Sequence, residues 1–536
     1  MSTTAISGDD TVEQITLQTQ VMLLTGIVML LAFIMVFPIT HDHSIFQRGG
    51  EAILHGGVLY RDYIDIKPPL IYYVFAGIDW VFGYNEIGMR IFDFIYQLLT
   101  TSLLLYTVRI FTGNARLSYW VGYTYVLLYV SFNNSSLQCE TLAVLPMVLA
   151  ALFSYFGKDK VIFYVASGVA AGIAVGLKYT LGLFIVALLI DILVQPKGGK
   201  KIQSLVLLGI GFTLGVIIGL FPFINSDIRV GYSSVLEYTR YYISLGVPVL
   251  SAEFGKMLIA LTTQHAVNNF SMLLLVSSSV SVYLFISQKE QHTSIQSILW
   301  LSIISVAVLY ISIVVEKKFA IYHFYRIAGF YSILAGIGGY YGYYYILRVI
   351  RTMQRKQYVV LLFVAGAILI FSPLPRTLNI MYNAYCALNN TTAYNNAYHS
   401  FNPEFESRTT SLNVAEVIKK RTTKEDKIHV STLGSSYIYH LIGEKTPTAF
   451  GNTQFYVAEG IPYSWKVKFV KELQSCTYLV VQDNDISNVN GHGQTSLQRL
   501  NAESLYSTEL NKFTRDTVVE HFVFLRRIEP FTKTVQ

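Results

Sequence analysis

Residues 21–38, VMLLTGIVMLLAFIMVFP, form an apolar run without a single charged side chain. A helix needs about 20 apolar residues to cross the hydrocarbon core of a bilayer. The preceding residues lack the basic start of a signal peptide, and no small-residue cleavage site follows. We therefore expect residues 18–38 to form an uncleaved first transmembrane helix.

The rest of the chain divides into an apolar part and a hydrophilic tail. Of the 536 residues, 53% are hydrophobic and 14% are charged, whereas soluble proteins carry about 25% charged residues. The chain has 40 basic and 33 acidic side chains, together 73, and residues 400–536 hold 31 of them, 16 basic and 15 acidic. This balance gives no support to a nucleic-acid partner. The three cysteines are too few and too scattered for a disulfide framework or a metal cluster.

Apolar stretches of bilayer length recur along the first 380 residues and predict eleven transmembrane helices. They lie at about 18–38, 87–111, 116–132, 140–156, 161–177, 179–195, 203–223, 266–287, 295–316, 321–347 and 357–374, with 69–83 as a further candidate. Lys and Arg concentrate in the connections that are cytoplasmic if the N-terminus is inside: about twelve in roughly 32 residues, against about ten in roughly 90 on the other side. We therefore expect a cytoplasmic N-terminus and an extracytoplasmic tail.

The predicted organisation has three regions: a cytoplasmic tail at 1–17, a transmembrane domain at 18–380, and an extracytoplasmic α/β domain with its linker at 381–536. The long external loops, 39–68 and 224–264, must lie on the membrane surface or line a cavity. In the tail, predicted strands alternate with predicted helices; the strands are 427–433, 477–483 and 521–527, and the helices lie near 411–421, 434–443 and 463–475. None of its short stretches has the spacing of a nucleophile, base or metal site, so we expect the tail to be accessory.

The first external loop is rich in ionisable side chains. The sequence HDHSIFQRGGEAILHGGVLYRDYIDIKPPLIYYVFAGIDWVFG, residues 41–83, places these side chains between two apolar segments. Ionisable residues at a membrane boundary are functional more often than structural. For any single residue, however, a solvated side chain reaching toward lipid headgroups is about as good an explanation. Asp42 stands out because it closely follows the first span, and Lys67 because Pro68 and Pro69 fix the backbone after it.

An aspartate just outside the first helix, followed by GVLYRDYIDIKPPLIYY at 57–73, resembles a known family. These features are similar to those of GT-C type, polyprenyl-phosphate-sugar-dependent glycosyltransferases, the superfamily of protein O-mannosyltransferases and lipid A aminoarabinose transferases. The resemblance implies a polytopic α-helical GT-C fold with roughly eleven to thirteen transmembrane helices and a small extracytoplasmic C-terminal α/β domain. It also implies that Asp42 is the catalytic base and that Lys67 binds the donor phosphate, with Arg61 and Asp65 as further substrate contacts.

This chain departs from the aminoarabinose transferases directly before Lys67. Those enzymes carry an acidic residue there, whereas Ile66 stands here and Asp65 lies one position further back. Any metal site built on that acid is therefore in doubt. A divalent cation stays open as a cofactor.

Further candidates lie at the external ends of later spans. Glu140 begins the fourth span and either assists Asp42 or is a first-turn carboxylate stabilised by the helix dipole. Lys178 follows the Gly-rich fifth span and either contacts the donor phosphate or reaches toward headgroups. The segment EKKFAIYHFYR at 316–326 resembles an aromatic-rich family segment. Its residues His323, Tyr325 and Arg326 are expected to hold the phosphate, with an interfacial anchor as the alternative.

These features predict a membrane glycosyltransferase in a prokaryotic plasma membrane. The expected partners are a polyprenyl-phosphate-linked sugar donor, an acceptor hydroxyl on a lipid, glycan or protein, and the surrounding membrane lipids. The expected reaction is an inverting single displacement with Asp42 as base. A transporter or a flippase for lipid-linked glycans is the alternative, but such proteins place ionisable groups near the bilayer midplane and contain internal repeats. A glycan polymerase or ligase shares the one-sided layout but not the Lys-Pro-Pro loop.

Overall fold

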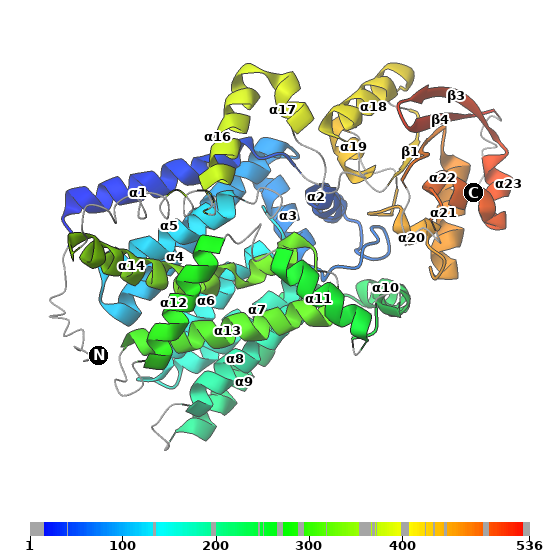
Figure 1. Cartoon of the computed structure of the whole chain (residues 1–536). Helices are drawn as coiled ribbons and strands as arrows, with labels where there is room; N and C mark the ends of the chain where they lie inside the picture. The colour runs from blue at the N-terminus through cyan, green and yellow to red at the C-terminus, as the bar shows by residue number, and fades with distance from the viewer. Residues whose placement is uncertain are drawn as a thin grey trace. The chain divides into compact units, whose positions relative to one another are not determined.

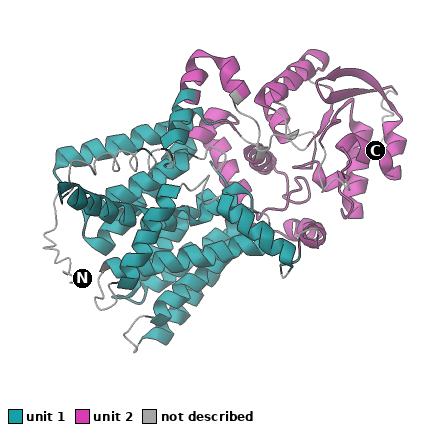
Figure 2. Cartoon of the chain, viewed as in Figure 1, with its two compact units in different colours: residues 1–37, 91–219, 248–382 teal, residues 38–90, 220–247, 383–536 magenta. Residues whose placement is uncertain are grey.

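The computed structural model describes most of the chain. The described residues are 15–39, 41–131, 136–194, 200–244, 247–249, 251–264, 272–287, 294–317, 319–352, 366, 370, 372, 374–397, 407–423, 425–432, 435–443, 448–485 and 493–528. The chain forms two compact units, shown in different colours in Figure 2. Unit 1 contains Met1–Phe37, Ile91–Gly219 and Pro248–Tyr382, and unit 2 contains Pro38–Arg90, Leu220–Val247 and Asn383–Gln536. The loop 39–68 therefore belongs to the same unit as the tail, whereas the loop 224–264 is divided between the two units.

Unit 1 is helical, and its elements are labelled in Figure 1. They are α1 (Leu17–Leu31) with η1 (Ala32–Val36), α4 (Glu86–Thr112), α5 (Ala115–Val130), α6 (Cys139–Gly157), α7 (Phe163–Leu177), η3 (Tyr179–Leu183) with α8 (Phe184–Val194), α9 (Lys201–Gly219), α11 (Ala252–Gln264), α12 (Met272–Ser287), α13 (Ser294–Glu316), η6 (Ile321–Ile327) with α14 (Ala328–Thr352), and α16 (Leu374–Asn389). The first five residues of α4 and the last seven of α16 fall in unit 2.

The predicted spans agree with this helical structure. Within the described residues each of the first ten coincides with helix, whereas 266–271 of the eighth and most of the eleventh, 357–374, lie outside them. Five helices of the described part are long and apolar enough to cross a membrane, among them Leu17–Val36 and Ile295–Glu316, and further apolar helices are shorter. The chain is therefore an integral membrane protein.

Glycines allow helices α7 and α9 to pack closely in unit 1. A Cβ atom on Gly172 would lie 2.4 Å from the carbonyl oxygen of Phe212, and one on Gly215 would lie 2.2 Å from that of Val169. Small residues allow membrane helices to approach to backbone contact. This packing fixes α7, and Lys178 directly follows its last residue.

Unit 2 combines the segments Pro38–Arg90 and Leu220–Val247 with the tail domain. Its helices are α2 (His41–Leu54), α3 (Leu70–Phe82), η4 (Phe221–Ile224), α10 (Ser226–Ser244), α17 (Thr391–Ala397), α18 (Arg408–Arg421), α19 (Ser435–Ile442), α20 (Gln454–Val457), α21 (Tyr463–Ser475), α22 (Ser496–Ala502) and α23 (Ser504–Leu510). The 224–264 loop, expected to lie on the membrane surface or to line a cavity, contains the helices α10 and α11.

The tail domain contains a four-stranded sheet in the order β1-β2-β4-β3. The strands are β1 (Ile428–Ser431), β2 (Tyr478–Gln482), β3 (Phe513–Val519) and β4 (Phe522–Arg527). Strand β1 pairs parallel with β2, and the other two pairings are antiparallel. Buried residues of α18 and α19, including Val414 and Ile438, pack with the strands in one apolar core. The three predicted strands and three predicted helices are confirmed, whereas β3 was not predicted.

Candidate functional site

Ionisable residues from four separate stretches of sequence meet inside unit 1. We call Glu140, Lys178, Glu316, His323 and Arg326 the buried charge cluster. Glu140 lies in the first turn of α6, where the helix dipole favours a carboxylate. Lys178 lies where α7 ends and η3 begins, in an extended backbone conformation that interrupts the helix. Glu316 ends α13, and η6 carries His323 and Arg326.

Arg326 is fully buried and holds the cluster together. Its Nη2 lies 3.1 Å from Oε1 of Glu140 and 2.7 Å from Oε1 of Glu316. Its Nη1 donates to the hydroxyls of Ser312 at 2.7 Å and Thr180 at 3.1 Å, and its Nε donates to the carbonyl oxygen of His323 at 3.0 Å. A guanidinium has five N–H groups, and five acceptors surround this one.

Lys178 also bridges the two glutamates. Its Nζ lies 2.7 Å from Oε2 of Glu316 and forms a short ion pair with Glu140. The Lys178 side chain is 14% exposed, whereas that of Arg326 is 0% exposed. Two carboxylates and two cations therefore balance at a site where an unpaired charge would be very costly.

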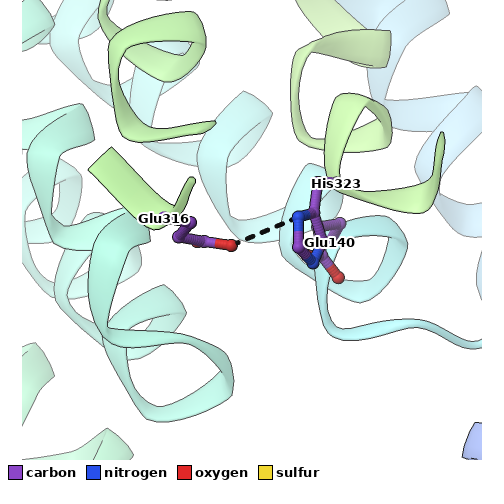
Figure 3. Close-up of side chains that lie close together, drawn as sticks. All are labelled: Glu140, Glu316 and His323. Carbon is purple, nitrogen blue, oxygen red and sulfur yellow. Dashed lines mark ion pairs between the residues drawn. The ribbon is translucent and has the colours of Figure 1, made fainter. Parts of the chain in front are cut away.

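His323 completes the cluster on the side of η6. Its Nδ1 lies 3.5 Å from Oε2 of Glu316, and its Nε2 lies 3.8 Å from Oε1 of Glu140. In Figure 3, Glu316 points from the end of its helix toward His323 and Glu140.

The three side chains of Figure 3 have ligand types that a metal ion can use. One ligand atom from each of Glu140, Glu316 and His323 lies within 4.8 Å of the others. Both carboxylates are already paired with Lys178 and Arg326, however, and these cations would repel a divalent ion. The donor set therefore fits an ion-pair cluster better than a metal site.

Tyr325 is also buried in unit 1. Its ring packs edge-on against Tyr129, with the centroids 5.6 Å apart. The Tyr129 hydroxyl donates to both carboxylate oxygens of Asp93, at 2.6 and 2.7 Å. Tyr325 thus packs against the ring of a tyrosine that is bonded to Asp93.

The second group of predicted residues lies in unit 2, around Asp65. Asp65 is 4% exposed and accepts hydrogen bonds from the Tyr72 hydroxyl at 2.6 Å and the Ile66 N–H at 2.7 Å. Burial raises the pKa of Asp65; the Lys67 ammonium and these hydrogen bonds lower it, and the Asp42 carboxylate raises it further. Asp42 and Lys67 therefore both lie within electrostatic range of Asp65.

The loop structure positions Asp42 and Lys67. Asp42 is half-buried in the first turn of α2. Lys67 is half-buried, with its Nζ 4.8 Å from the centroid of the Phe46 ring, within the range of a cation–π contact. The Tyr60 hydroxyl donates to the Lys67 carbonyl at 2.8 Å, and Pro69 forms the N-cap of α3. The Lys-Pro-Pro stretch is thus held between α2 and α3.

Arg61 has a different environment. Its side chain is 51% exposed and pairs with Asp62 at 2.8 Å and with Asp227 of α10 at 2.7 Å. The structure thus places this predicted substrate contact in a surface ion-pair network.

Four members of the buried charge cluster were predicted from the sequence as candidate site residues, whereas Glu316 was not. This acid opens the EKKFAIYHFYR segment, and only the later residues were selected. Two cations predicted in an apolar region require anions. Glu140 alone leaves one of the positive charges of Lys178 and Arg326 unbalanced. This unbalanced charge could have predicted a second carboxylate.

Comparisons with known proteins identify the fold. Residues 66–224 match the family model of dolichyl-phosphate-mannose-protein mannosyltransferases. No curated protein matches the chain. Among solved structures, ArnT from Cupriavidus metallidurans bound to undecaprenyl phosphate is similar, with a TM-score of 0.59 and 14% identity over 95% of this chain and 98% of that one. The resemblance predicted from the sequence is thereby confirmed: residues 66–224 match the mannosyltransferase family model, and the chain has the GT-C fold of ArnT.

Proposed function

We propose that this membrane protein is a glycosyltransferase that moves a sugar from a polyprenyl-phosphate donor to a hydroxyl of an extracytoplasmic acceptor. The family-model match over residues 66–224 and the GT-C fold support this class of activity. The lipid phosphate bound to the similar ArnT structure supports a polyprenyl-phosphate donor. The observation that carries the proposal is that Lys67 contacts Phe46 of α2, the helix whose first turn contains Asp42.

The proposed reaction requires a base and a cation. The acceptor oxygen attacks the anomeric carbon, and its proton passes to the carboxylate of Asp42. The bond from that carbon to the bridging phosphate oxygen breaks, and its electron pair leaves with polyprenyl phosphate. Lys67 stabilises the negative charge that grows on the phosphate. A single displacement of this kind inverts the anomeric configuration.

The buried charge cluster has a different role in this proposal. Because five acceptors surround the five N–H groups of Arg326, we assign it to holding Glu140 and Glu316 rather than to the phosphate. Lys178 is partly exposed and has a third N–H group, so it is the better candidate for a phosphate contact. Glu140 orients Lys178 through their ion pair.

A donor-cleavage assay tests the proposal. Purified protein in lipid nanodiscs is given polyprenyl-phosphate donors that carry different radiolabelled sugars, together with candidate acceptors. We expect one free polyprenyl phosphate for each transferred sugar, and loss of both products in Asp42→Asn. A transporter or flippase would move the donor without cleaving it. If no donor is cleaved while reconstituted vesicles translocate intact donor, the transferase assignment fails.

We further propose that the N-terminus is cytoplasmic and the tail extracytoplasmic, which the Lys and Arg distribution supports. The described cysteines, Cys139, Cys386 and Cys476, are buried. Lys420 in the tail is 71% exposed, so Lys420→Cys provides an accessible thiol. We expect a membrane-impermeant maleimide to label it from outside intact cells. If the thiol is labelled only after the membrane is permeabilised, the tail is cytoplasmic and the proposed orientation is wrong.

A further inference from the structure

Helix α2 carries a buried cation two turns after Asp42. Arg48 is 1% exposed. Its Nη1 donates to the Ser436 hydroxyl at 3.1 Å, and its Nη2 donates to the Thr448 carbonyl at 3.2 Å. Its guanidinium also lies 4.4 Å from the centroid of the Tyr439 ring. All three partners belong to the tail domain, almost 400 residues further along the chain.

This environment is unusual for a buried charge. Desolvating a guanidinium is costly unless it is paired and hydrogen-bonded. Among the described residues, these two hydrogen bonds of Arg48 go to neutral acceptors and its guanidinium lies over an aromatic face, whereas two carboxylates contact Arg326. Such a site tolerates little movement, because any displacement of α2 would leave a buried charge without its acceptors.

Two further contacts connect the same structural elements. Gln47, adjacent to Arg48, accepts a hydrogen bond from Nδ1 of His440 at 2.8 Å and donates to Asp79 of α3 at 2.8 Å. Ile64, adjacent to Asp65, donates its N–H to the carbonyl of Ala449 at 2.6 Å and accepts from the N–H of Gly451 at 2.9 Å. The tail domain therefore holds both α2 and the loop that leads to Lys67.

We propose that Arg48 is a positioning residue through which the tail domain fixes helix α2, and with it Asp42, for sugar transfer. The role assigned to Asp42 rests on the proposed function. The link between α2 and the tail rests on geometry alone. In this proposal the tail domain fixes the position of the helix that carries the base, although it supplies no reacting group itself.

The test uses four variants of the full-length protein in nanodiscs. Arg48→Lys keeps the charge but loses the two-pronged donor geometry. Ser436→Ala removes one acceptor on the tail side and is the milder change. The double variant combines them. Arg421→Lys is the matched control, because Arg421 forms a surface pair with Asp516 in the tail.

The first readout is hydrogen exchange of the backbone amides in α2. We expect exchange over residues 41–54 to become about tenfold faster in Arg48→Lys, with β1 and β2 as protected as in the wild type. Arg421→Lys should match the wild type. Unchanged exchange of α2 in Arg48→Lys would overturn the link.

The second readout is kinetic. We expect Arg48→Lys to lower kcat about tenfold with donor KM within about twofold, because misplacing the base affects the transition state more than donor binding. The double variant should be no slower than Arg48→Lys, because both changes break the same contact, the one between Arg48 and Ser436. Multiplying losses, or normal kcat with faster α2 exchange, would overturn the positioning role. A wild type without any transfer would refute the proposed function, and hydrogen exchange would then still decide whether Arg48 links α2 to the tail.

Discussion

The buried charge cluster of unit 1 and the surroundings of Glu472 in unit 2 hold buried carboxylates in different ways. In unit 1, Glu140 and Glu316 are in direct contact with Lys178 and Arg326. In unit 2, Glu472 accepts hydrogen bonds from the Thr448 hydroxyl at 2.6 Å and the Ala449 N–H at 2.8 Å. Its nearest imidazole, that of His429, lies 3.6 Å away.

This difference has consequences for what each unit can do. The two glutamates of the buried charge cluster are matched by cations, which offsets the cost of burying charge among apolar helices. Around Glu472, burial lowers the pKa of His429 to about 3 and raises that of Glu472 to about 7. His429 is therefore neutral at physiological pH, and its contact with Glu472 is not an ion pair. The buried charge cluster should therefore respond strongly to loss of one partner, and the surroundings of Glu472 should respond to pH.

The largest expected effect is that of Arg326→Met. The change leaves Glu140 and Glu316 with Lys178 as the remaining cation of their pairs, and breaking a buried ion pair costs about 3–5 kcal/mol. We expect a large drop in the thermal midpoint of the purified protein and poor recovery of monodisperse material. Arg61→Met is the matched control because Arg61 is exposed. Equal midpoints for the two variants would contradict the account.

A second variant sharpens this test. In Arg326→Met the Glu316 carboxylate has lost its partner Arg326. Adding Glu316→Gln removes that carboxylate. Removing both partners of a buried pair is less harmful than removing one. We therefore expect the double variant to recover part of the lost thermal midpoint. A further drop would show that Glu316 and Arg326 do not act as a pair.

The next effect is the pH dependence caused by Glu472. Its pKa rises on folding from an ordinary value of 4.5 to about 7, so between these values the folded state binds a proton that the unfolded state lacks. Stability must therefore fall as pH rises through this window, by at most about 3 kcal/mol. Glu472→Gln should remove this component, and the difference in thermal midpoint between the two proteins should change from pH 5 to pH 8. If the thermal midpoints of the two proteins changed in parallel with pH, the raised pKa of Glu472 would be contradicted.

The smallest expected effect is that of Arg61→Ala. Its exposed pairs with Asp62 and Asp227 are screened by solvent, and such pairs contribute little. We expect an unchanged thermal midpoint and a donor KM within about threefold of the wild type. A much larger increase in donor KM would restore Arg61 as a substrate contact.

The helices and the tail strands could be predicted because their patterns are local. Apolar runs defined the spans, and buried strands such as Tyr478–Gln482 are continuous apolar stretches. Strand β3 was missed because it lies at the sheet edge and most of its residues are exposed, so its sequence lacks that signal.

The candidate site could be predicted only in part. Asp42 was predicted because it closely follows the first span, and Lys67 because Pro68 and Pro69 follow it; both are features of one short stretch of sequence. The contacts of Arg48 with Ser436 and Thr448 connect residues almost 400 positions apart, and no periodicity or spacing encodes such a pairing. Glu316 resembled an ordinary helix-end acid until the structure placed it beside Arg326.

The central claim is that Asp42, and not Glu140 of the buried charge cluster, is the base of the proposed transfer. Single-turnover transfer by Asp42→Asn and Glu140→Gln, with donor binding measured in parallel, tests this most directly. We predict that Asp42→Asn slows the chemical step by about 100-fold or more with donor affinity unchanged. Glu140→Gln should weaken donor binding or lower the stability of the protein. The rate of sugar transfer from donor that is already bound should stay near normal. A near-normal rate in Asp42→Asn together with a lost chemical step in Glu140→Gln would contradict the account and move the base to the buried charge cluster.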